Sequence, residues 1–145
     1  MTDRPTRAAY PFHTPITTRW SDNDIYGHIN NVVYYSFFDS AANLYLIQHG
    51  LAIASSPVIG LVVESRCEYH APLAYPVTLS AGVRTDKLGN RAVTYGIAIF
   101  AEGEDLAAAH GHFVHVFVDR ETRKPVPIPA ALRTALSALA PTTDR

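Results

Sequence analysis

The chain has 145 residues, of which 48% are hydrophobic and 17% charged, and its formal net charge is −1. This length suits one domain with a sizeable core, so we expect a single domain over residues 1–145. A net charge near zero argues against general binding of nucleic acid, which needs a basic face. The low charged fraction indicates a rather apolar surface that another subunit could cover, so a homo-oligomer is expected.

The N-terminus and the cysteine content bear on the compartment. Residues 1–5 carry charges with no apolar stretch behind them, so no signal peptide is expected. No segment approaches the roughly 18 apolar residues that span a membrane. The single cysteine, Cys67, excludes an internal disulfide and is most simply a small core residue. We therefore predict a cytoplasmic protein without a membrane association.

The predicted elements begin with a strand, a polar loop and a long helix. Alternation over residues 14–20 predicts a strand, and the Asp-, Asn- and Gly-rich residues 21–30 predict a loop. Apolar residues then recur at helical spacing over residues 31–49, with Asn30 or Asn31 as the N-cap. Apolar side chains cover so much of this helix that we expect it to be enclosed.

The remainder of the chain is mostly strand. Alternating or apolar runs joined by short turns predict four strands, over residues 58–70, 77–84, 91–101 and 106–119. A short terminal helix is predicted over residues 130–139. An α+β fold, with an antiparallel sheet wrapped around the long helix, satisfies this order of elements.

The segment between the first strand and the helix carries the chemistry. Residues 19–31 read RWSDNDIYGHINN, and they combine two carboxylates, a glycine, a histidine and several amides. A carboxylate just before a helix can act on a substrate whose developing negative charge rests on the free N–H groups of that helix. This layout is typical of a site for acyl transfer or acyl hydrolysis.

This segment resembles the signature of hotdog-fold acyl-CoA thioesterases, and among them the 4-hydroxybenzoyl-CoA thioesterase-like group, whose pattern is D-x-D-x-x-G-H-x-N-N. Residues 68–73 (EYHAPL), 116–119 (VFVD) and 123–129 (RKPVPIP) are also similar to that family. The resemblance implies a hotdog fold, in which a five-stranded antiparallel sheet wraps around one long central helix. It further implies a homodimer or homotetramer with the active site at the dimer interface. The substrate would be an acyl-CoA, with no metal or redox cofactor.

By this resemblance, the catalytic carboxylate falls on Asp24. A carboxylate there can attack the thioester carbonyl directly or deprotonate a water molecule. Backbone N–H groups near Asn30 and Asn31 would bind the carbonyl oxygen as negative charge grows on it. Asp24 could instead make an Asx turn or cap the helix. For Asp22, a hydrogen bond within the loop is the expected role.

Other residues are weaker candidates for the site. Gly27 is interpreted as a position of positive φ or of close approach to the substrate, and His28 as a group that orients the site or holds the loop together. Glu64 interrupts an apolar run, so it would be paired, at an interface or catalytic. Tyr34 begins an aromatic cluster that could line an acyl pocket or belong to the core. Arg91 is one of several basic residues that could bind the phosphates of coenzyme A.

Three alternatives remain open. His110 and His112 share a strand face but lack a third ligand at a usual spacing, and His115 points the other way, which disfavours a metal site. A hotdog hydratase would resemble D-x-N-x-x-H, whereas Asp22 is followed by Asp24. A protein that binds acyl thioesters without turnover would keep the fold and lack the activity.

Overall fold

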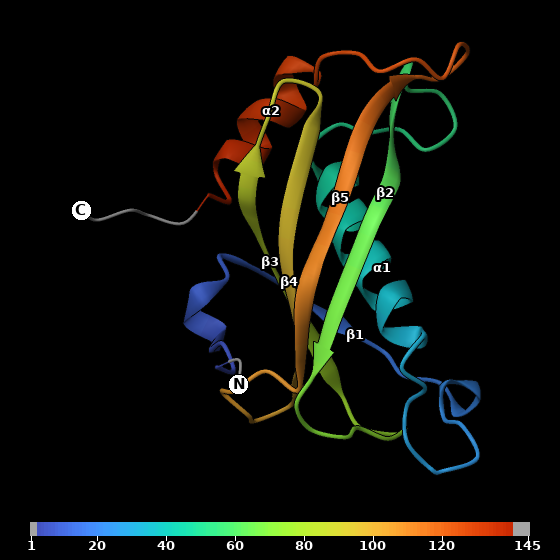
Figure 1. The fold of residues 1–145 in the computed structure, drawn as a ribbon, viewed down its shortest axis with the longest axis vertical. Coiled ribbons are helices and arrows are strands. Elements are labelled where there is room, and N and C mark those ends of the chain that lie inside the picture. Colours follow the sequence, from blue (N-terminus) through green and yellow to red (C-terminus); the bar gives the residue numbers. More distant parts are fainter. Residues whose placement is uncertain (1–2, 141–145) are drawn as a thin grey trace.

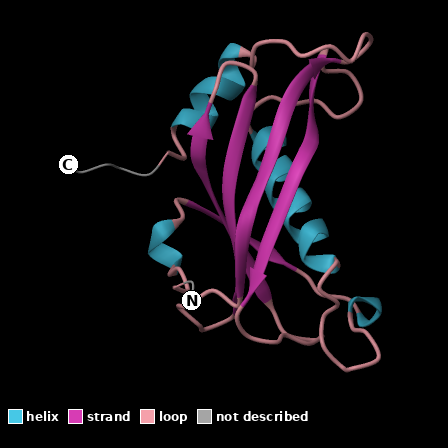
Figure 2. Ribbon diagram, in the orientation of Figure 1, coloured by secondary structure: helices cyan, strands magenta, loops and turns pink. Residues whose placement is uncertain are grey.

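A computed structural model describes residues 3–140 of the chain (Figure 1). Within these residues, five strands form one antiparallel sheet in the order β1-β3-β4-β5-β2. Two α-helices and two short 3₁₀ helices accompany the sheet (Figure 2). In chain order the elements are η1 (Arg7–Ala9), β1 (Phe12–Ile16), η2 (Trp20–Asp22), α1 (Val33–Gln48), β2 (Val58–Tyr69), β3 (Leu79–Leu88), β4 (Ala92–Ala101), β5 (Ala109–Asp119) and α2 (Ala130–Ser137).

The main core lies between α1 and one face of the sheet. The buried side chains of α1 recur at three- and four-residue steps, as a helix that packs on a sheet requires. They include Phe38, Ala42 and Leu46, which are fully buried. The opposing strands contribute the alternate side chains that face the helix, such as Ile97 and Phe113. The predicted α+β fold with a five-stranded antiparallel sheet is therefore confirmed.

The other side of α1 is open within this chain. Ser36, Asp39 and Ile47 are exposed on it, because the sheet covers the helix from one side only. The predicted enclosure of the helix is therefore not seen within the described chain. Neither α1 nor α2, the two α-helices of residues 3–140, is long and apolar enough to cross a lipid bilayer.

Several predicted boundaries shift, and local hydrogen bonds explain two of the shifts. The first strand ends at Ile16 because the carboxylate of Asp22 accepts the Arg19 N–H at 2.8 Å and turns the chain into η2. The helix begins at Val33, since the Asn30 side chain accepts the Val32 N–H at 2.9 Å and holds the preceding turn. By contrast, β2, β4 and α2 match their predictions to within two residues.

Strand β2 forms an edge of the sheet and pairs along its length with β5 only. A register shift between Val62 and Glu64 marks a β-bulge in this strand. Leu61, Val62 and Val63 are exposed along the edge, and the side chain of Val63 is 61% exposed. At its C-terminal end, β2 leads into residues 70–75, which lie against the loop that precedes α1.

Candidate active site

The loop before α1 contains a tight turn that starts at Asp24. The N–H of Asp24 donates to the carbonyl oxygen of His28 at 2.9 Å, and the N–H of Gly27 donates to that of Asp24 at 3.0 Å. Gly27 closes the turn with a φ of +83°, which confirms its predicted positive φ. A side chain is disfavoured in this left-handed conformation even though the space around Gly27 is open.

Hydrogen bonds hold this loop against the segment after β2. The N–H of Ile29 donates to the carbonyl oxygen of Leu73 at 2.8 Å, and the N–H of Tyr75 donates to Oδ1 of Asn23 at 2.9 Å. Asp22 is 1% exposed, and its carboxylate also accepts a hydrogen bond from the Arg19 guanidinium at 2.9 Å. The expected loop role of Asp22 is therefore confirmed.

A surface depression of about 520 Å³ lies where this loop meets the C-terminal end of β2. We call it the site depression, and four of its lining residues, Asp24, His28, Asn31 and Tyr34, are predicted site residues. The sequence interpretation missed the other lining residues. These are Tyr26, Ile29, Tyr69, His70, Ala71 and Pro72.

The carboxylate of Asp24 has two different environments. Its Oδ1 accepts the N–H of Tyr26 at 2.9 Å, which is an Asx turn. Its Oδ2 has no hydrogen-bond partner among residues 3–140. Asp24 is partly exposed and lines the site depression. The turn thus orients the carboxylate and leaves one oxygen for another partner.

Only one of the two predicted N–H donors at the helix start is available. The N–H of Asn30 donates to the carbonyl oxygen of Asp22 at 2.9 Å, and the Asn30 side chain caps Val32. Asn30 therefore holds the turn and does not line the site depression. The N–H of Asn31 has no acceptor within the part of the chain that the structure describes, and Asn31 lines the depression.

Two tyrosines form an aromatic wall of the site depression. The rings of Tyr34 and Tyr69 meet edge to face at a centroid distance of 5.1 Å. Burial, with a smaller effect from the Cys67 thiol, raises the pKa of Tyr34 to about 12. Burial also raises the pKa of Tyr69, so both hydroxyls stay protonated at neutral pH. Because side chains alternate along β2, Tyr69 lies on the same face of the sheet as Cys67. This alternation in the sequence could have indicated which face Tyr69 occupies.

Glu64 and Arg91 do not reach the site depression of their own chain. The exposed carboxylate of Glu64 lies 2.6 Å from Nε2 of His112 on the outer face of the sheet. Tyr69 pairs with Ala109, which pairs with Ile99 near the end of β4, whereas Arg91 precedes the start of that strand. Arg91 therefore lies at the opposite end of the sheet from Asp24.

The remaining candidates for metal binding or nucleophilic chemistry are separated. His110 and His112 lie on the outer face of β5, whereas His115 is 1% exposed in the core, which confirms the predicted difference in direction. Within residues 3–140, no group of three or more His, Cys, Asp or Glu side chains is placed to hold a metal ion. Burial raises the pKa of the Cys67 thiol to about 11, which disfavours the nucleophilic thiolate.

Known proteins share this fold, and they resemble this sequence to different degrees. The sequence model that defines the thioesterase-like superfamily matches residues 18–136 of this chain. The crystal structure of the PA5185 protein of Pseudomonas aeruginosa is 54% identical, with a TM-score of 0.95 over 97% of this chain and 99% of that one. A 1,4-dihydroxy-2-naphthoyl-CoA thioesterase of Synechocystis has a TM-score of 0.79 at 17% identity over 88% of this chain and 96% of its own.

A further relative, matched by its sequence, is less similar to this chain than the PA5185 protein is. The uncharacterized protein YsmA of Bacillus subtilis is 24% identical over 121 residues, which span 83% of this chain and 81% of YsmA. The structural likenesses show that the chain has the hotdog fold that its motif predicts.

Proposed function

Because the chain belongs to the thioesterase-like superfamily, we propose that it hydrolyses acyl-CoA thioesters to a carboxylic acid and free coenzyme A. The observation that carries this proposal is that one depression at the start of α1 is lined by two residues with unengaged polar groups. They are Asp24, whose Oδ2 has no hydrogen-bond partner among residues 3–140, and Asn31, whose N–H has no acceptor there. These groups have complementary roles in acyl hydrolysis, since one supplies a base or nucleophile and the other stabilises an oxyanion.

In the proposed mechanism, the thioester carbonyl lies between these two groups. The free Oδ2 of Asp24 removes a proton from a water molecule, or attacks the carbonyl carbon itself. The Asn31 N–H donates to the carbonyl oxygen as it becomes negative, and loss of one such donor in other enzymes raises the barrier by about 3 kcal/mol. The C–S bond then breaks, and coenzyme A leaves as a thiolate that takes up a proton. Attack by water gives the carboxylic acid directly, whereas attack by Asp24 gives an acyl–Asp24 anhydride that a water molecule then hydrolyses to the acid and the free carboxylate.

The aromatic wall of Tyr34 and Tyr69 supports a hydrophobic binding place for the acyl group. Flat, apolar ring faces bury the acyl chain or aryl ring, and the protonated Tyr34 hydroxyl provides a polar contact at its edge, since the Tyr69 hydroxyl donates to the carbonyl oxygen of Asn31. His28 lies on the exposed rim of the depression, where it can contact the polar part of the substrate.

A homodimer through β2 would complete this site. An unpaired strand edge with apolar side chains favours pairing with a second copy, and β2 presents Leu61, Val62 and Val63 there. The site depression contains no Arg or Lys from its own chain, although coenzyme A carries phosphates. Basic residues of the partner subunit are the proposed source of that charge. The cytoplasmic location and the lack of a metal or redox cofactor stay predictions.

The test is free-thiol release from short-chain, long-chain and aromatic acyl-CoAs by wild type and by Asp24→Asn. We expect the variant to lose at least about two orders of magnitude in kcat, because general-base catalysis contributes 10²–10⁴-fold. The matched control is Glu121→Gln, an exposed carboxylate at the opposite end of the sheet, which should keep full activity.

The other outcomes separate the alternatives. Equal rates for wild type and Asp24→Asn would contradict the assigned role of Asp24 and direct attention to Glu64. Saturable binding of acyl-CoA by wild type without any thiol release would instead support a binding protein. That second candidate is consistent with the Asx turn, because the turn gives Asp24 a structural role without catalysis.

A further inference from the structure

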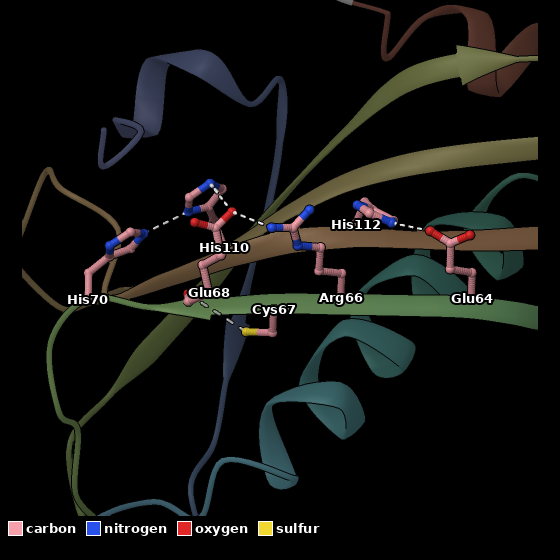
Figure 3. Close-up of polar contacts among 7 residues, drawn as sticks. All are labelled: Glu64, Arg66, Cys67, Glu68, His70, His110 and His112. Carbon is pink, nitrogen blue, oxygen red and sulfur yellow. Dashed lines mark hydrogen bonds and ion pairs between the residues drawn. The ribbon is translucent and has the colours of Figure 1, made fainter. Parts of the chain in front are cut away.

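A row of charged and imidazole side chains on the outer face of β2 and β5 (Figure 3) ends at His70, a residue that lines the site depression. At its end, Nε2 of His70 lies 2.8 Å from Nδ1 of His110, and the two rings stack at a centroid distance of 4.9 Å. On the far side of His110, its Nε2 lies 4.0 Å from Oε2 of Glu68. Arg66 lies 3.9 Å from the same carboxylate oxygen.

The contact between the two rings restricts where their protons can be. A hydrogen bond between Nε2 of His70 and Nδ1 of His110 needs one N–H and one lone pair. The carboxylate of Glu68 favours a proton on Nε2 of His110, which leaves Nδ1 of a neutral His110 as the acceptor. His70 must then donate from Nε2, so its Nδ1 carries a lone pair.

His70 is also part of the candidate active site. It lines the same depression as Asp24 and Asn31, and its backbone N–H donates to the carbonyl oxygen of Ala108 at 2.8 Å. Its Nδ1 has no hydrogen-bond partner among residues 3–140. We propose, on the basis of the proposed thioesterase function, that Nδ1 of His70 accepts a hydrogen bond from an N–H or O–H of the bound thioester.

The surroundings of the pair favour the neutral form of His110. The charged groups that face the pair are Glu68 and Arg66 from β2 and Arg84 from β3. Burial is the main cause that lowers the pKa of His110, so its ring is favoured as the neutral acceptor that this arrangement requires.

The test compares His70→Phe and His70→Asn with wild type in acyl-CoA hydrolysis. For His70→Phe at pH 8 we expect KM to rise about three- to tenfold, the value of one neutral hydrogen bond, with kcat unchanged. An asparagine oxygen can take the place of Nδ1, so His70→Asn should restore most of the binding. The control is His112→Asn, which alters a histidine of the same strand face outside the depression and should behave as wild type.

The choice of substrate gives a second readout that a purely structural role would not change. A loss confined to hydroxylated aryl substrates would assign the donor to the acyl group, and an equal loss for all substrates would assign it to the pantetheine amides. Both results support the acceptor role.

Binding of a thioether analogue of acyl-CoA, measured by calorimetry, separates this inference from the proposed function. If wild type binds the analogue without hydrolysing acyl-CoA, weaker binding by His70→Phe still supports the acceptor. If His70→Phe binds the analogue as tightly as wild type does, the inference is overturned and the thioesterase function is unaffected. A wild type that neither binds nor hydrolyses overturns both.

Discussion

The hydroxyl of Tyr69, at the end of β2, donates a 2.8 Å hydrogen bond to the carbonyl oxygen of Asn31, just before α1. This bond joins the end of the sheet to a residue whose N–H has no acceptor among residues 3–140. The bonded carbonyl belongs to the Asn31–Val32 peptide, whereas the Asn31 N–H belongs to the Asn30–Asn31 peptide, so Tyr69 positions the donor only through the backbone of Asn31. An oxyanion donor must be well oriented to be effective, because hydrogen bonds weaken steeply with angle.

Removal of this hydroxyl should therefore reduce catalysis more than stability. We expect Tyr69→Phe to lower kcat about tenfold and to destabilise the fold by about 1 kcal/mol, the net value of one hydrogen bond. Tyr75→Phe is the control, since the Tyr75 hydroxyl has no hydrogen-bond partner among residues 3–140. Steady-state kinetics and urea unfolding measure the two effects. An unchanged kcat in Tyr69→Phe would mean that other contacts position Asn31.

The turn at Gly27 should tolerate a methyl group poorly. The left-handed φ of +83° costs a non-glycine residue about 1–3 kcal/mol, so Gly27→Ala should unfold at lower urea concentration and lose activity as the turn relaxes. Gly89→Ala is the control, because a Cβ at that hairpin glycine would make only an ordinary contact with Ala92. Equal stability of the two variants would mean that the left-handed φ at position 27 costs an alanine little.

The buried imidazole of His115 should make the fold sensitive to acid. Burial lowers its pKa to about 4, whereas a histidine in the unfolded chain titrates near 6.5. Below pH 6.5 the unfolded state binds a proton that the folded state does not, so stability falls until the pH reaches about 4. The full effect is about 3 kcal/mol.

The measurement is urea unfolding at several values between pH 4 and pH 8. His115→Gln keeps a polar group beside the Tyr95 hydroxyl, which lies 3.1 Å from Nδ1 in the native protein, but it cannot titrate. The variant should be less stable at pH 8 and should lose less stability on acidification than wild type does. If both proteins show the same pH dependence, other groups are responsible for it.

The open edge of β2 predicts a change of assembly on substitution. Val63→Lys places a charge on a 61% exposed side chain at the bulge, and it should convert a dimer into monomers in analytical ultracentrifugation. Thiol release should fall when the dimer dissociates, because the proposed site needs the partner subunit. Leu106→Lys alters an exposed apolar residue outside the edge strand and should leave the assembly intact. A wild type that sediments as a monomer would contradict the proposed dimer.

Much of this fold follows from local pattern. The alternation of β2 and β4, the helical spacing of α1 and the turn residues between the strands depend on near neighbours, and they were predicted closely. The motif around Asp24 could be recognised for the same reason, since its residues are adjacent in the chain. The positive φ of Gly27 and the buried role of Asp22 also arise within this short segment.

Contacts between distant segments could not be predicted from local sequence pattern. Tyr69 and His70 join the site only because β2 ends beside the loop before α1, and the availability of the Asn31 N–H depends on which neighbours accept the other N–H groups. The separation of Glu64 and Arg91 from Asp24 likewise follows from the strand register. Sequence periodicity determines which face a side chain occupies, because that depends on local backbone geometry. Only the pairing and packing of whole strands determine which of those side chains meet.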